Sequence, residues 1–520
     1  MSECEDETAV LIVNSDGLEV NSCEEANNES SDDEDRKTLS ADEALETAGF
    51  GKFHFLMVFV MGWANSADAI EMLSISFVLP YASCELNATD LELGFLTAVG
   101  FGGMMIGSYF WGGISDIKGR IKTAMICQAT NALFIIGSGL SQSLWFLILM
   151  RLISGFGVGG TSPLIFVYTI ETLPAKNRGR MSGLLSCSFM VGQVLVAGMA
   201  WLIIPMNWSW TPSPGFTLNS WRIFLFISAF PAFTSFLLFM MFPESPRYLI
   251  GRNRMTEAKK AIRYIYRWNG NKEIYDDSYT IKRPAEVAKS KGCCGTLKQI
   301  AKNSWKLVAI EDVRPRFIYS SAITFCLSFS YYGLTMWFPT LITRMQASNA
   351  SSVCDDILPA VNKTNCPIGD QHVVYTDTFL QAVSSFPGNL FYLVFIDVIG
   401  RRMITGVSMI LTALAVFFIW FIHSYTGSIA MSCVFSAITV VSWNAMSLLS
   451  TEIFPTELRS TAKGVQSAMF NRVAAILANV IFGFLVSTHC EVPILLISCL
   501  LALGGILTYK LPDTTNISID

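Results

Sequence analysis

Two acidic residues lie inside a long apolar stretch near the start of the chain, where charged side chains are rare. Asp68 and Glu71 are three residues apart, a spacing that places both side chains on one face of a helix. A carboxylate in an apolar medium must face a cavity or a partner, because burial disfavours its charged form. We interpret the pair as a proton- or cation-binding site. The alternative is a structural pair that forms hydrogen bonds to neighbouring helices.

An arginine, Arg472, lies ten residues into another apolar stretch, roughly 15 Å along a helix that rises about 1.5 Å per residue. Three interpretations follow for Arg472. It forms an ion pair with Asp68 or Glu71, it binds an anionic substrate, or its long side chain extends toward the membrane surface. We group Arg472 with the two carboxylates as candidate coupling residues. Arg151, near the start of a further apolar stretch, we interpret as structural.

The apolar stretches are long and numerous. The chain has 520 residues, of which 52% are hydrophobic and 15% charged, and its mean hydropathy is +0.45. A run of roughly 20 apolar residues spans a bilayer as a helix. The fold class is therefore predicted to be an all-α membrane protein. We predict twelve transmembrane helices, at 53–80, 91–114, 122–140, 143–170, 181–204, 220–242, 317–340, 374–396, 402–421, 428–450, 462–486 and 491–510.

Two sequence signatures each occur twice. Asp-x-x-Gly-Arg begins at Asp116 and again at Asp397, and Glu-x-x-Pro-x-x-x-Arg begins at Glu171 and again at Glu452. Both repeats have the same offset of 281 residues. The chain therefore contains two copies of one unit, which is typical of membrane transporters built from repeats. We predict two pseudo-symmetric halves of six transmembrane helices each.

The charged residues of these signatures lie at the ends of predicted helices. Acidic side chains there can form charge-assisted contacts with guanidinium groups, and such contacts can break when two halves move against each other. The alternative is static anchoring of the helix ends. We favour a gating network formed by Asp116, Arg120, Glu171, Arg178, Asp397, Arg401, Glu452 and Arg459.

The repeat also divides the chain into segments. Residues 1–46 hold 16 of the 41 acidic residues, a composition that predicts a disordered tail. A polar segment between the halves contains a stretch with helical character, which we expect to brace the surface. The predicted segments are an acidic tail (1–50), a first half (51–242), a linking segment (243–316), a second half (317–510) and a C-terminal tail (511–520).

The distribution of Lys and Arg predicts the orientation. The segment 243–316 holds 17 of them, whereas the alternate loops hold Arg344 and Lys363. The positive-inside rule then places both termini in the cytosol and the loop 341–373 in a lumen. Two sites in that loop are candidate glycosylation sites, Asn349 and Asn362. Two cysteines in the same loop, Cys354 and Cys366, are candidates for a disulfide.

Several strings carry a family resemblance. Together with the paired signatures, they resemble the major facilitator superfamily and, more narrowly, the synaptic vesicle glycoprotein 2 family. This chain departs from that family in its short tail and its lumenal loop of about 33 residues, which puts the roles of a large loop in doubt. The strings are Ala67–Glu71, Ala200–Pro205, Ser220–Phe224, Pro243–Tyr248, Tyr331–Pro339 and Ser442–Ala445.

The resemblance implies that Trp201 and Trp443 face one another across a central cavity. Stacking on a planar or sugar-like ligand would supply affinity, and Asn444 would add a directional hydrogen bond. We add Tyr331 and Tyr332 to this candidate substrate site. The alternative for these aromatic residues is packing or an interfacial belt.

The leading prediction is a secondary transporter that moves a small organic solute by alternating access, with H⁺ coupling through Asp68 and Glu71. The alternative is a non-transporting, glycosylated receptor or regulator of exocytosis, whose acidic tail binds cytosolic trafficking proteins. A synaptic or other secretory vesicle membrane is expected, with the plasma membrane as the alternative. The sequence contains no enzyme motif and predicts no cofactor and no metal. Its basic loops are explained by topology, so the predicted partners are a solute, H⁺ and the bilayer, not nucleic acid.

Overall fold

The computed structural model describes residues 38–206, 208–270, 280–281, 305, 307–348, 371–422, 424–486 and 489–513. The first 37 residues of the acidic tail, most of the linking segment after residue 270, and residues 349–370 of the predicted lumenal loop lie outside the described residues. The glycosylation of Asn349 and Asn362 and the disulfide between Cys354 and Cys366 therefore remain predictions.

The first half contains six transmembrane segments. The segments are α2 (Lys52–Glu85), α3 (Asp90–Lys118), α4 (Arg120–Gly139), α5 (Leu144–Thr172), α6 (Arg178–Ile203), and the pair α7 (Ser220–Ser228) and α8 (Phe230–Phe239), which together form the sixth. Short 3₁₀ turns, Ala175–Asn177 and Ile204–Met206, flank α6. Local caps fix these boundaries: Thr89 accepts a hydrogen bond from the backbone N–H of Glu92 at 3.3 Å, and the Glu92 side chain accepts from the Thr89 N–H at 2.8 Å.

The second half repeats the pattern. Its segments are α12 (Arg314–Ser348), the pair α13 (Gln371–Val383) and α14 (Ser385–Ile399), α15 (Arg401–Phe421), α16 (Tyr425–Glu452), the run α17 (Thr456–Val465), η3 (Gln466–Asn471) and α18 (Arg472–Leu485), and α19 (Glu491–Thr508). Within the described residues, ten helical segments are long and apolar enough to cross a membrane, and α4 and α12 occupy the two remaining predicted spans. The predicted all-α, twelve-helix class is confirmed.

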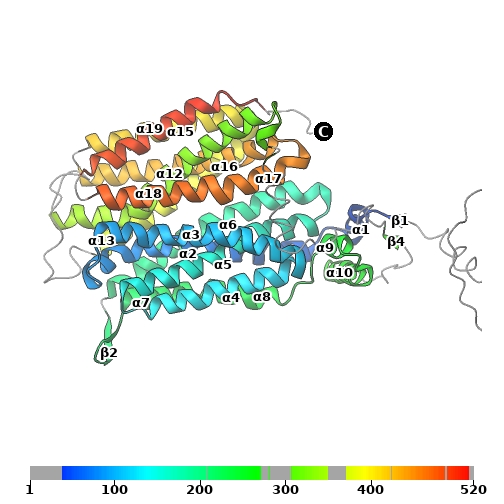
Figure 1. The fold of residues 1–520 in the computed structure, drawn as a ribbon, viewed down its shortest axis with the longest axis horizontal. Coiled ribbons are helices and arrows are strands. Elements are labelled where there is room, and N and C mark those ends of the chain that lie inside the picture. Colours follow the sequence, from blue (N-terminus) through cyan, green and yellow to red (C-terminus); the bar gives the residue numbers. More distant parts are fainter. Residues whose placement is uncertain are drawn as a thin grey trace, which may run out of the picture.

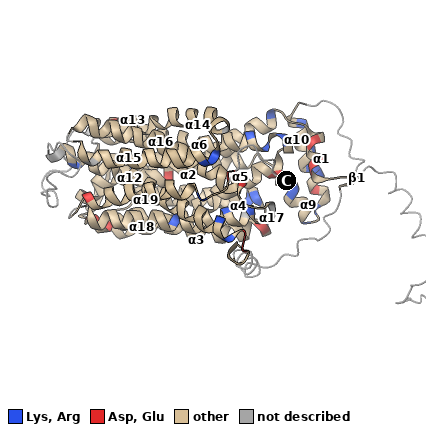
Figure 2. Cartoon of the chain, turned by 90° about the horizontal axis from the view of Figure 1, so that it is seen from above, with Lys and Arg blue, Asp and Glu red and all other residues tan. Residues whose placement is uncertain are grey.

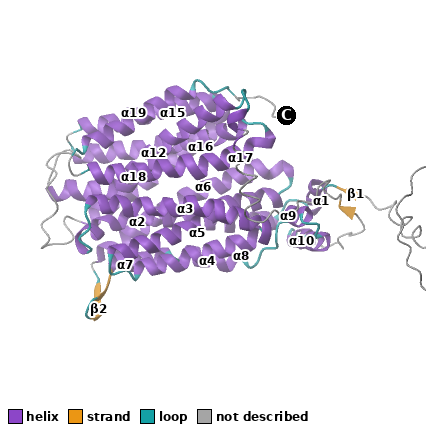
Figure 3. Ribbon diagram, in the orientation of Figure 1, coloured by secondary structure: helices purple, strands orange, loops and turns teal. Residues whose placement is uncertain are grey.

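The two halves lie side by side along the length of the molecule, with the second half above the first in Figure 1. Small elements sit at the ends of the helices. A hairpin of β2 (Ser209–Ser213) and β3 (Phe216–Asn219) connects α6 to α7, and Figure 3 shows it projecting from one end of the bundle. At the other end lie α1 (Ala41–Ala48), α9 (Pro246–Gly251), α10 (Met255–Trp268), and the parallel pair β1 (Thr38–Leu39) and β4 (Thr280–Ile281).

Lys and Arg gather at the end that carries α1, α9 and α10, as Figure 2 shows. We call this the basic end, and the end with the β2–β3 hairpin the opposite end. The signature residues Arg120 and Arg401 begin α4 and α15 at the basic end. The predicted cytosolic side corresponds to the basic end.

Glycines bring helices of the same half into close contact. Gly103 and Gly107 on α3 form a Gly-x-x-x-Gly pattern that faces α5. A Cβ atom at Gly103 would lie 2.1 Å from the carbonyl oxygen of Leu152, and one at Gly107 would lie 2.1 Å from that of Phe156. Small residues of this kind allow transmembrane helices to pack backbone against backbone. The α3–α5 contact thus forms a rigid part of the first half.

The halves also touch each other, toward the opposite end. Asp90 at the start of α3 forms an ion pair with Arg344 on α12. The Tyr375 hydroxyl on α13 donates a hydrogen bond of 3.0 Å to the carbonyl oxygen of Phe77 on α2. Each contact joins one half to the other, so the described structure is closed at the opposite end.

The short helix α1 is docked at the basic end by ion pairs and hydrogen bonds. Asp42 forms ion pairs with Arg178 and with Arg247. The Asn269 side-chain amide, just after α10, donates hydrogen bonds to the carbonyl oxygens of Ala48 (3.0 Å) and Gly49 (2.8 Å). The acidic segment before the first transmembrane helix therefore ends in a structured contact with the first half.

We expect the Asp42→Asn substitution to loosen α1. Burial raises the pKa of the Asp42 carboxyl, but the contacts with Arg178 and Arg247 outweigh burial, so its pKa lies below the ordinary value. The stabilisation is therefore present above the unfolded pKa and is lost as the pH falls through the lower folded value. Because Asp42 is about half exposed, with 47% of its side chain accessible, we expect the substitution to weaken the docking of α1 by at most about 1 kcal/mol.

Limited proteolysis of residues 38–52 measures this effect, with up to about fivefold faster cleavage expected for Asp42→Asn. Glu46→Gln is the matched control, because it removes one carboxylate charge from an exposed position on the same helix. Equal cleavage of the two variants would show that Asp42 does not hold α1 in place.

Candidate functional site

The repeated signatures form the same contact in each half. In the first half, Arg120 lies 2.6 Å from Asp116 and 3.4 Å from Glu171. In the second half, Arg401 lies 3.5 Å from Glu452. Each arginine therefore joins the loop after one helix to the end of another helix in the same half. The geometry brings the predicted signature residues together, and their role in gating remains a proposal.

Glycine in the first signature has a steric reason. Gly119 has a φ angle of +106°, and a Cβ there would lie 2.2 Å from a carboxylate oxygen of Glu244. That carboxylate accepts hydrogen bonds from the backbone N–H groups of Arg120 (2.7 Å) and Ile121 (3.2 Å). Glu244 therefore caps the start of α4, and only glycine leaves room for it. Gly400 has a φ of +92° at the equivalent turn.

The arginines of the second signature differ between the halves. Arg178 contacts Asp42 and donates a hydrogen bond of 3.1 Å to the carbonyl oxygen of Leu173. Arg459 has a buried Nε atom with no hydrogen-bond partner among the described residues. The side chain of Asp397 is not among the described ones. The repeat is thus reproduced at Arg120 and Arg401, and it diverges at Arg178 and Arg459.

Glu71 forms a buried ion pair, and its partner is Arg151. The Arg151 guanidinium lies 2.9 Å from the Glu71 carboxylate, and only 3% and 2% of the two side chains are exposed. Ser154 also donates to the carboxylate, and Ser74 accepts from Arg151 at 3.2 Å. Glu71 is therefore paired with Arg151, and not with Arg472 as one of the interpretations of Arg472 expected. Buried charges of this kind need both an opposite charge and hydrogen bonds.

Asp68 has a different environment, one turn away on α2. Its side chain is 2% exposed, and one carboxylate oxygen accepts a hydrogen bond of 3.3 Å from Gln128 on α4. The other oxygen is buried and has no hydrogen-bond partner among the described residues. Asn131, one turn further along α4, also has both polar side-chain atoms buried without a described partner. A buried carboxylate with one hydrogen bond from a neighbouring helix is a candidate for taking up a proton, because burial disfavours its charged form.

Arg472 begins α18, directly after the π-helical turn η3. Turns of this type often occur at functional sites. Its guanidinium carbon lies 6.0 Å from the ring centroid of Phe101 on α3, and its Nη1 atom is buried without a described hydrogen-bond partner. Arg472 also lies close enough to act electrostatically on Asp68 and Tyr332. The residue therefore reaches from the second half toward the first.

Aromatic side chains gather where the two halves meet. The ring centroids of Tyr331 and Tyr332 on α12 lie 5.5 and 5.8 Å from that of Trp443 on α16. The first half contributes Phe101, 4.8 Å from Tyr332, and Gln193, which lies 3.4 Å from the Tyr331 hydroxyl. We call these five residues the aromatic cluster. Three of its members are predicted substrate-site residues, and the structure brings them together.

Two predicted residues lie apart from the aromatic cluster. Trp201 stacks on Phe379 of α13, with ring centroids 5.9 Å apart and an interplanar angle of 16°, and 38% of its side chain is exposed. Asn444 donates a hydrogen bond of 2.8 Å to Asn389, which in turn lies 3.3 Å from the sulfur of Cys187 on α6. Trp201 and Trp443 therefore contact different partners, and the expectation that they face one another across a central cavity stays a prediction.

Sequence reasoning missed several residues of this region. Gln128, Gln193 and Asn389 are polar residues within apolar spans. The signal that could have found them is the burial of an amide in a membrane, which requires a hydrogen-bond partner. A polar-residue count within each predicted span would have marked them.

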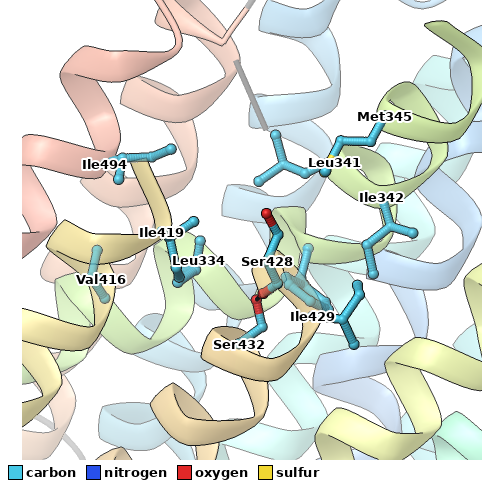
Figure 4. A pocket seen from close by; sticks show the side chains of 11 residues that line it. Leu334, Leu341, Ile342, Met345, Val416, Ile419, Ser428, Ile429, Ser432 and Ile494 are labelled. Atoms are coloured by element: carbon cyan, nitrogen blue, oxygen red, sulfur yellow. Dashed lines mark hydrogen bonds between the residues drawn. The ribbon is translucent and has the colours of Figure 1, made fainter. Parts of the chain in front are cut away.

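A small cavity elsewhere in the second half does not qualify as a solute site. It lies between α12, α15, α16 and α19 and has a volume of about 10 Å³. Figure 4 shows its lining by aliphatic side chains such as Leu334 and Ile419, with the hydroxyl groups of Ser428 and Ser432. This is far below the roughly 300 Å³ or more that small-molecule sites occupy. The aromatic cluster and the buried charges are therefore the candidate functional site.

Two cysteines that the sequence analysis did not single out form disulfides. Cys84 at the end of α2 and Cys490 just before α19 are both disulfide-bonded. Both lie at the opposite end of the molecule, the predicted lumenal side. Disulfides there fit an oxidising compartment.

The arrangement defines the class of the protein. Twelve transmembrane segments form two repeated halves, which meet around buried polar and aromatic residues. The fold is that of the major facilitator superfamily. It is similar to the partially occluded inward-open conformation of the xylose transporter XylE from E. coli, with a TM-score of 0.66 and 17% identity over 90% of this chain and 99% of that chain.

The sequence itself identifies the family. The model of the Sugar (and other) transporter family matches residues 47–520, and the chain belongs to this family. Among curated relatives, synaptic vesicle glycoprotein 2C of Rattus norvegicus is 28% identical over 93% of this chain and 81% of its own length. Synaptic vesicle glycoprotein 2A of the same organism is 28% identical over 90% and 78%. The predicted resemblances are confirmed, and the chain is a multi-pass membrane protein of a transporter family.

Proposed function

We propose that this protein is a secondary transporter that moves a small organic solute across a membrane by alternating access. The supporting observation is that the aromatic cluster takes residues from both halves: Phe101 and Gln193 from the first, and Tyr331, Tyr332 and Trp443 from the second. A site built from both halves changes its exposure when the halves move, which is how such folds transport. Aromatic faces supply affinity, and Gln193 gives a directional polar contact.

The proposal includes H⁺ coupling. The buried Asp68 carboxylate accepts one hydrogen bond from Gln128 and lies within electrostatic reach of Arg472. Glu71 already forms an ion pair with Arg151. This favours Asp68 as the group that gains and loses the proton. The Glu71–Arg151 pair, one turn away on α2, would respond to the change in charge on Asp68. Arg472 would then respond to the charge on Asp68.

The membrane and orientation are part of the proposal. The relatives named synaptic vesicle glycoproteins support a vesicle membrane, with the basic end in the cytosol according to the positive-inside rule. The signature residues Arg120 and Arg401, with Asp116, Glu171 and Glu452 as partners within their own halves, would hold the helix ends that form the gates at the basic end.

Uptake into proteoliposomes across a panel of sugars, amines and organic acids tests the proposal. For a solute that is transported, we expect Trp443→Ala to raise the KM about fivefold or more, because a lost aromatic contact is worth about 1 kcal/mol beyond the area it buries. The control is Trp145→Ala, since 71% of that side chain is exposed on the outer surface. The absence of uptake for every solute would instead favour the receptor or regulator.

Asp68→Asn tests the coupling. It keeps the hydrogen bond that Asp68 accepts from Gln128 and removes the titratable group. We expect the variant to bind solute but to lose the dependence of uptake on an imposed pH gradient. Retention of that dependence would reject Asp68 as the coupling residue.

A further inference from the structure

A groove lies on the outer surface of the first half, between α4 and α8. Its volume is about 430 Å³, which falls within the range of small-molecule sites. Ala129 and Thr130 are small residues at its middle, and Phe134 and Phe236 border it from α4 and α8. The Thr130 hydroxyl donates a hydrogen bond of 2.8 Å to the carbonyl oxygen of Ile126, so it does not make the groove polar. The groove is therefore an apolar hollow.

The groove opens toward lipid and not toward the aromatic cluster. The exposed fractions of Ile126 and Leu133 on α4 are 39% and 63%, and that of Phe233 on α8 is 49%. Figure 1 shows α4 and α8 at the outer face of the first half, away from the second half. An occupant would therefore enter from the bilayer.

The length of the groove matches one leaflet. Its lining extends along α4 from Lys122 to Phe134, and twelve residues of helix rise roughly 18 Å. One leaflet of the hydrocarbon core is about 15 Å thick. An acyl chain that starts at the basic end would thus fit along the groove and end near the middle of the membrane.

The groove has a cation at one end. Lys122 is exposed in the first turn of α4, at the basic end. The nearby carboxylate of Glu244 is directed at the backbone N–H groups of Arg120 and Ile121, and it also accepts from the N–H of Ser245 at 3.0 Å. Lys122 therefore places a positive charge at the end of the apolar groove that lies at the membrane surface. A cation beside an apolar groove can bind the headgroup and an acyl chain of an anionic lipid together.

We propose that the groove between α4 and α8 binds an anionic phospholipid of the cytosolic leaflet, with one acyl chain along Ala129 and Thr130 and the phosphate-bearing headgroup at Lys122. The site is separate from the proposed solute site, and it does not depend on whether the protein transports a solute. A lipid bound across α4 and α8 would contact two helices that already pack against each other in the first half.

The test uses the full-length protein in phosphatidylcholine vesicles that contain phosphatidylserine with a photoactivatable acyl chain. We expect labelling of α4 between Met125 and Phe134, and of α8 near Phe236, to exceed that from the equivalent phosphatidylcholine probe. Lys122→Gln should reduce the preference for phosphatidylserine about fivefold, as expected for one basic residue at a membrane surface. Lys118→Gln is the matched control, because Lys118 is an exposed lysine at the same end that does not line the groove.

A second variant keeps the test independent of charge. Ala129→Trp fills the groove from a partly exposed position, so we expect it to abolish labelling by both lipid probes while the purified protein keeps its melting temperature. Equal labelling by the two probes in the natural protein would overturn the proposal in favour of non-selective surface lipid. Equal effects of Lys122→Gln and Lys118→Gln, or displacement of the probe by a sterol regardless of Lys122, would also overturn it.

Discussion

Substituting alanine for Gly94 and Gly483 together is expected to hold the protein open at the end that is closed in this structure. A Cβ at Gly94 on α3 would lie 2.8 Å from the carbonyl oxygen of Asn479, and one at Gly483 on α18 would lie 2.6 Å from that of Asp90. Both obstacles are backbone atoms, which cannot move aside as the end of a flexible side chain can. The two helices belong to different halves, so the clash acts on closure and not on the packing of either half.

The expected size follows from overpacking, which typically destabilises a contact by about 1–3 kcal/mol. The cost falls on the conformer that is closed at the opposite end. It therefore shifts the ratio of open to closed molecules about 5- to 150-fold toward the open state. Uptake should fall with it, since the cycle requires closure at each end in turn. Distances between spin labels at the exposed positions Leu91 and Val492 should increase, as measured by pulsed electron resonance.

Variants at two other glycines of α3 distinguish an effect on closure from an effect on folding. A Cβ at Gly102 meets no atom within 4 Å, so Gly102→Ala should behave as the natural protein. Gly103→Ala should instead destabilise the first half, because its Cβ would lie 2.1 Å from the carbonyl oxygen of Leu152 in the same half. Unchanged label distances in the Gly94/Gly483 variant would show that closure there does not depend on the contact between the two glycines.

The sequence predicted the elements well, for a physical reason. A bilayer requires long apolar helices, so each predicted span corresponds to a helical segment of the structure. What the apolar runs could not reveal are the interruptions. The sixth span breaks between α7 and α8 just before Pro231, and the eleventh contains the π-helical turn Gln466–Asn471. These depend on local hydrogen bonding, which hydropathy does not record.

The candidate site was predicted in part. The repeat marked the signature residues but not their pairing: Arg120 contacts Glu171 and Arg401 contacts Glu452, because each copy of the unit folds alike. The partners of residues that lack a counterpart in the other half were harder to predict. Asp68 and Glu71 share a helix face, yet they point to different partners, Gln128 on α4 and Arg151 on α5. Which neighbour receives which side chain depends on how α2 is rotated among its neighbours, and spacing along one helix does not fix that.

Aromatic residues illustrate the same limit. Tyr331, Tyr332 and Trp443 come together, whereas Trp201 stacks on Phe379. A tryptophan in a transmembrane helix can face lipid, another helix or a cavity with nearly the same local sequence around it. Only the packing of both halves decides between these environments.

Breaking the buried pair of Glu71 and Arg151 is expected to have the largest effect on stability. Glu71→Ala would leave the Arg151 guanidinium, of which 3% is exposed, without its carboxylate. Removing one partner of a buried ion pair costs about 3–5 kcal/mol, so we expect the melting temperature to fall by about 5 °C or more. Arg151→Ala should behave similarly, because it leaves the Glu71 carboxylate buried with the hydrogen bond from Ser154 as its remaining described polar contact.

The paired replacement Glu71→Met with Arg151→Met distinguishes a structural pair from a functional one. Apolar residues of similar size often replace a buried ion pair without loss of stability, so the melting temperature should return to within a few degrees of the natural value. Uptake should not return, because the cycle that we propose requires a charge on α2 that senses the protonation of Asp68. If the double variant regained both stability and pH-dependent uptake, Glu71 and Arg151 would be a structural link between α2 and α5, and coupling would rest on Asp68 and Arg472 alone.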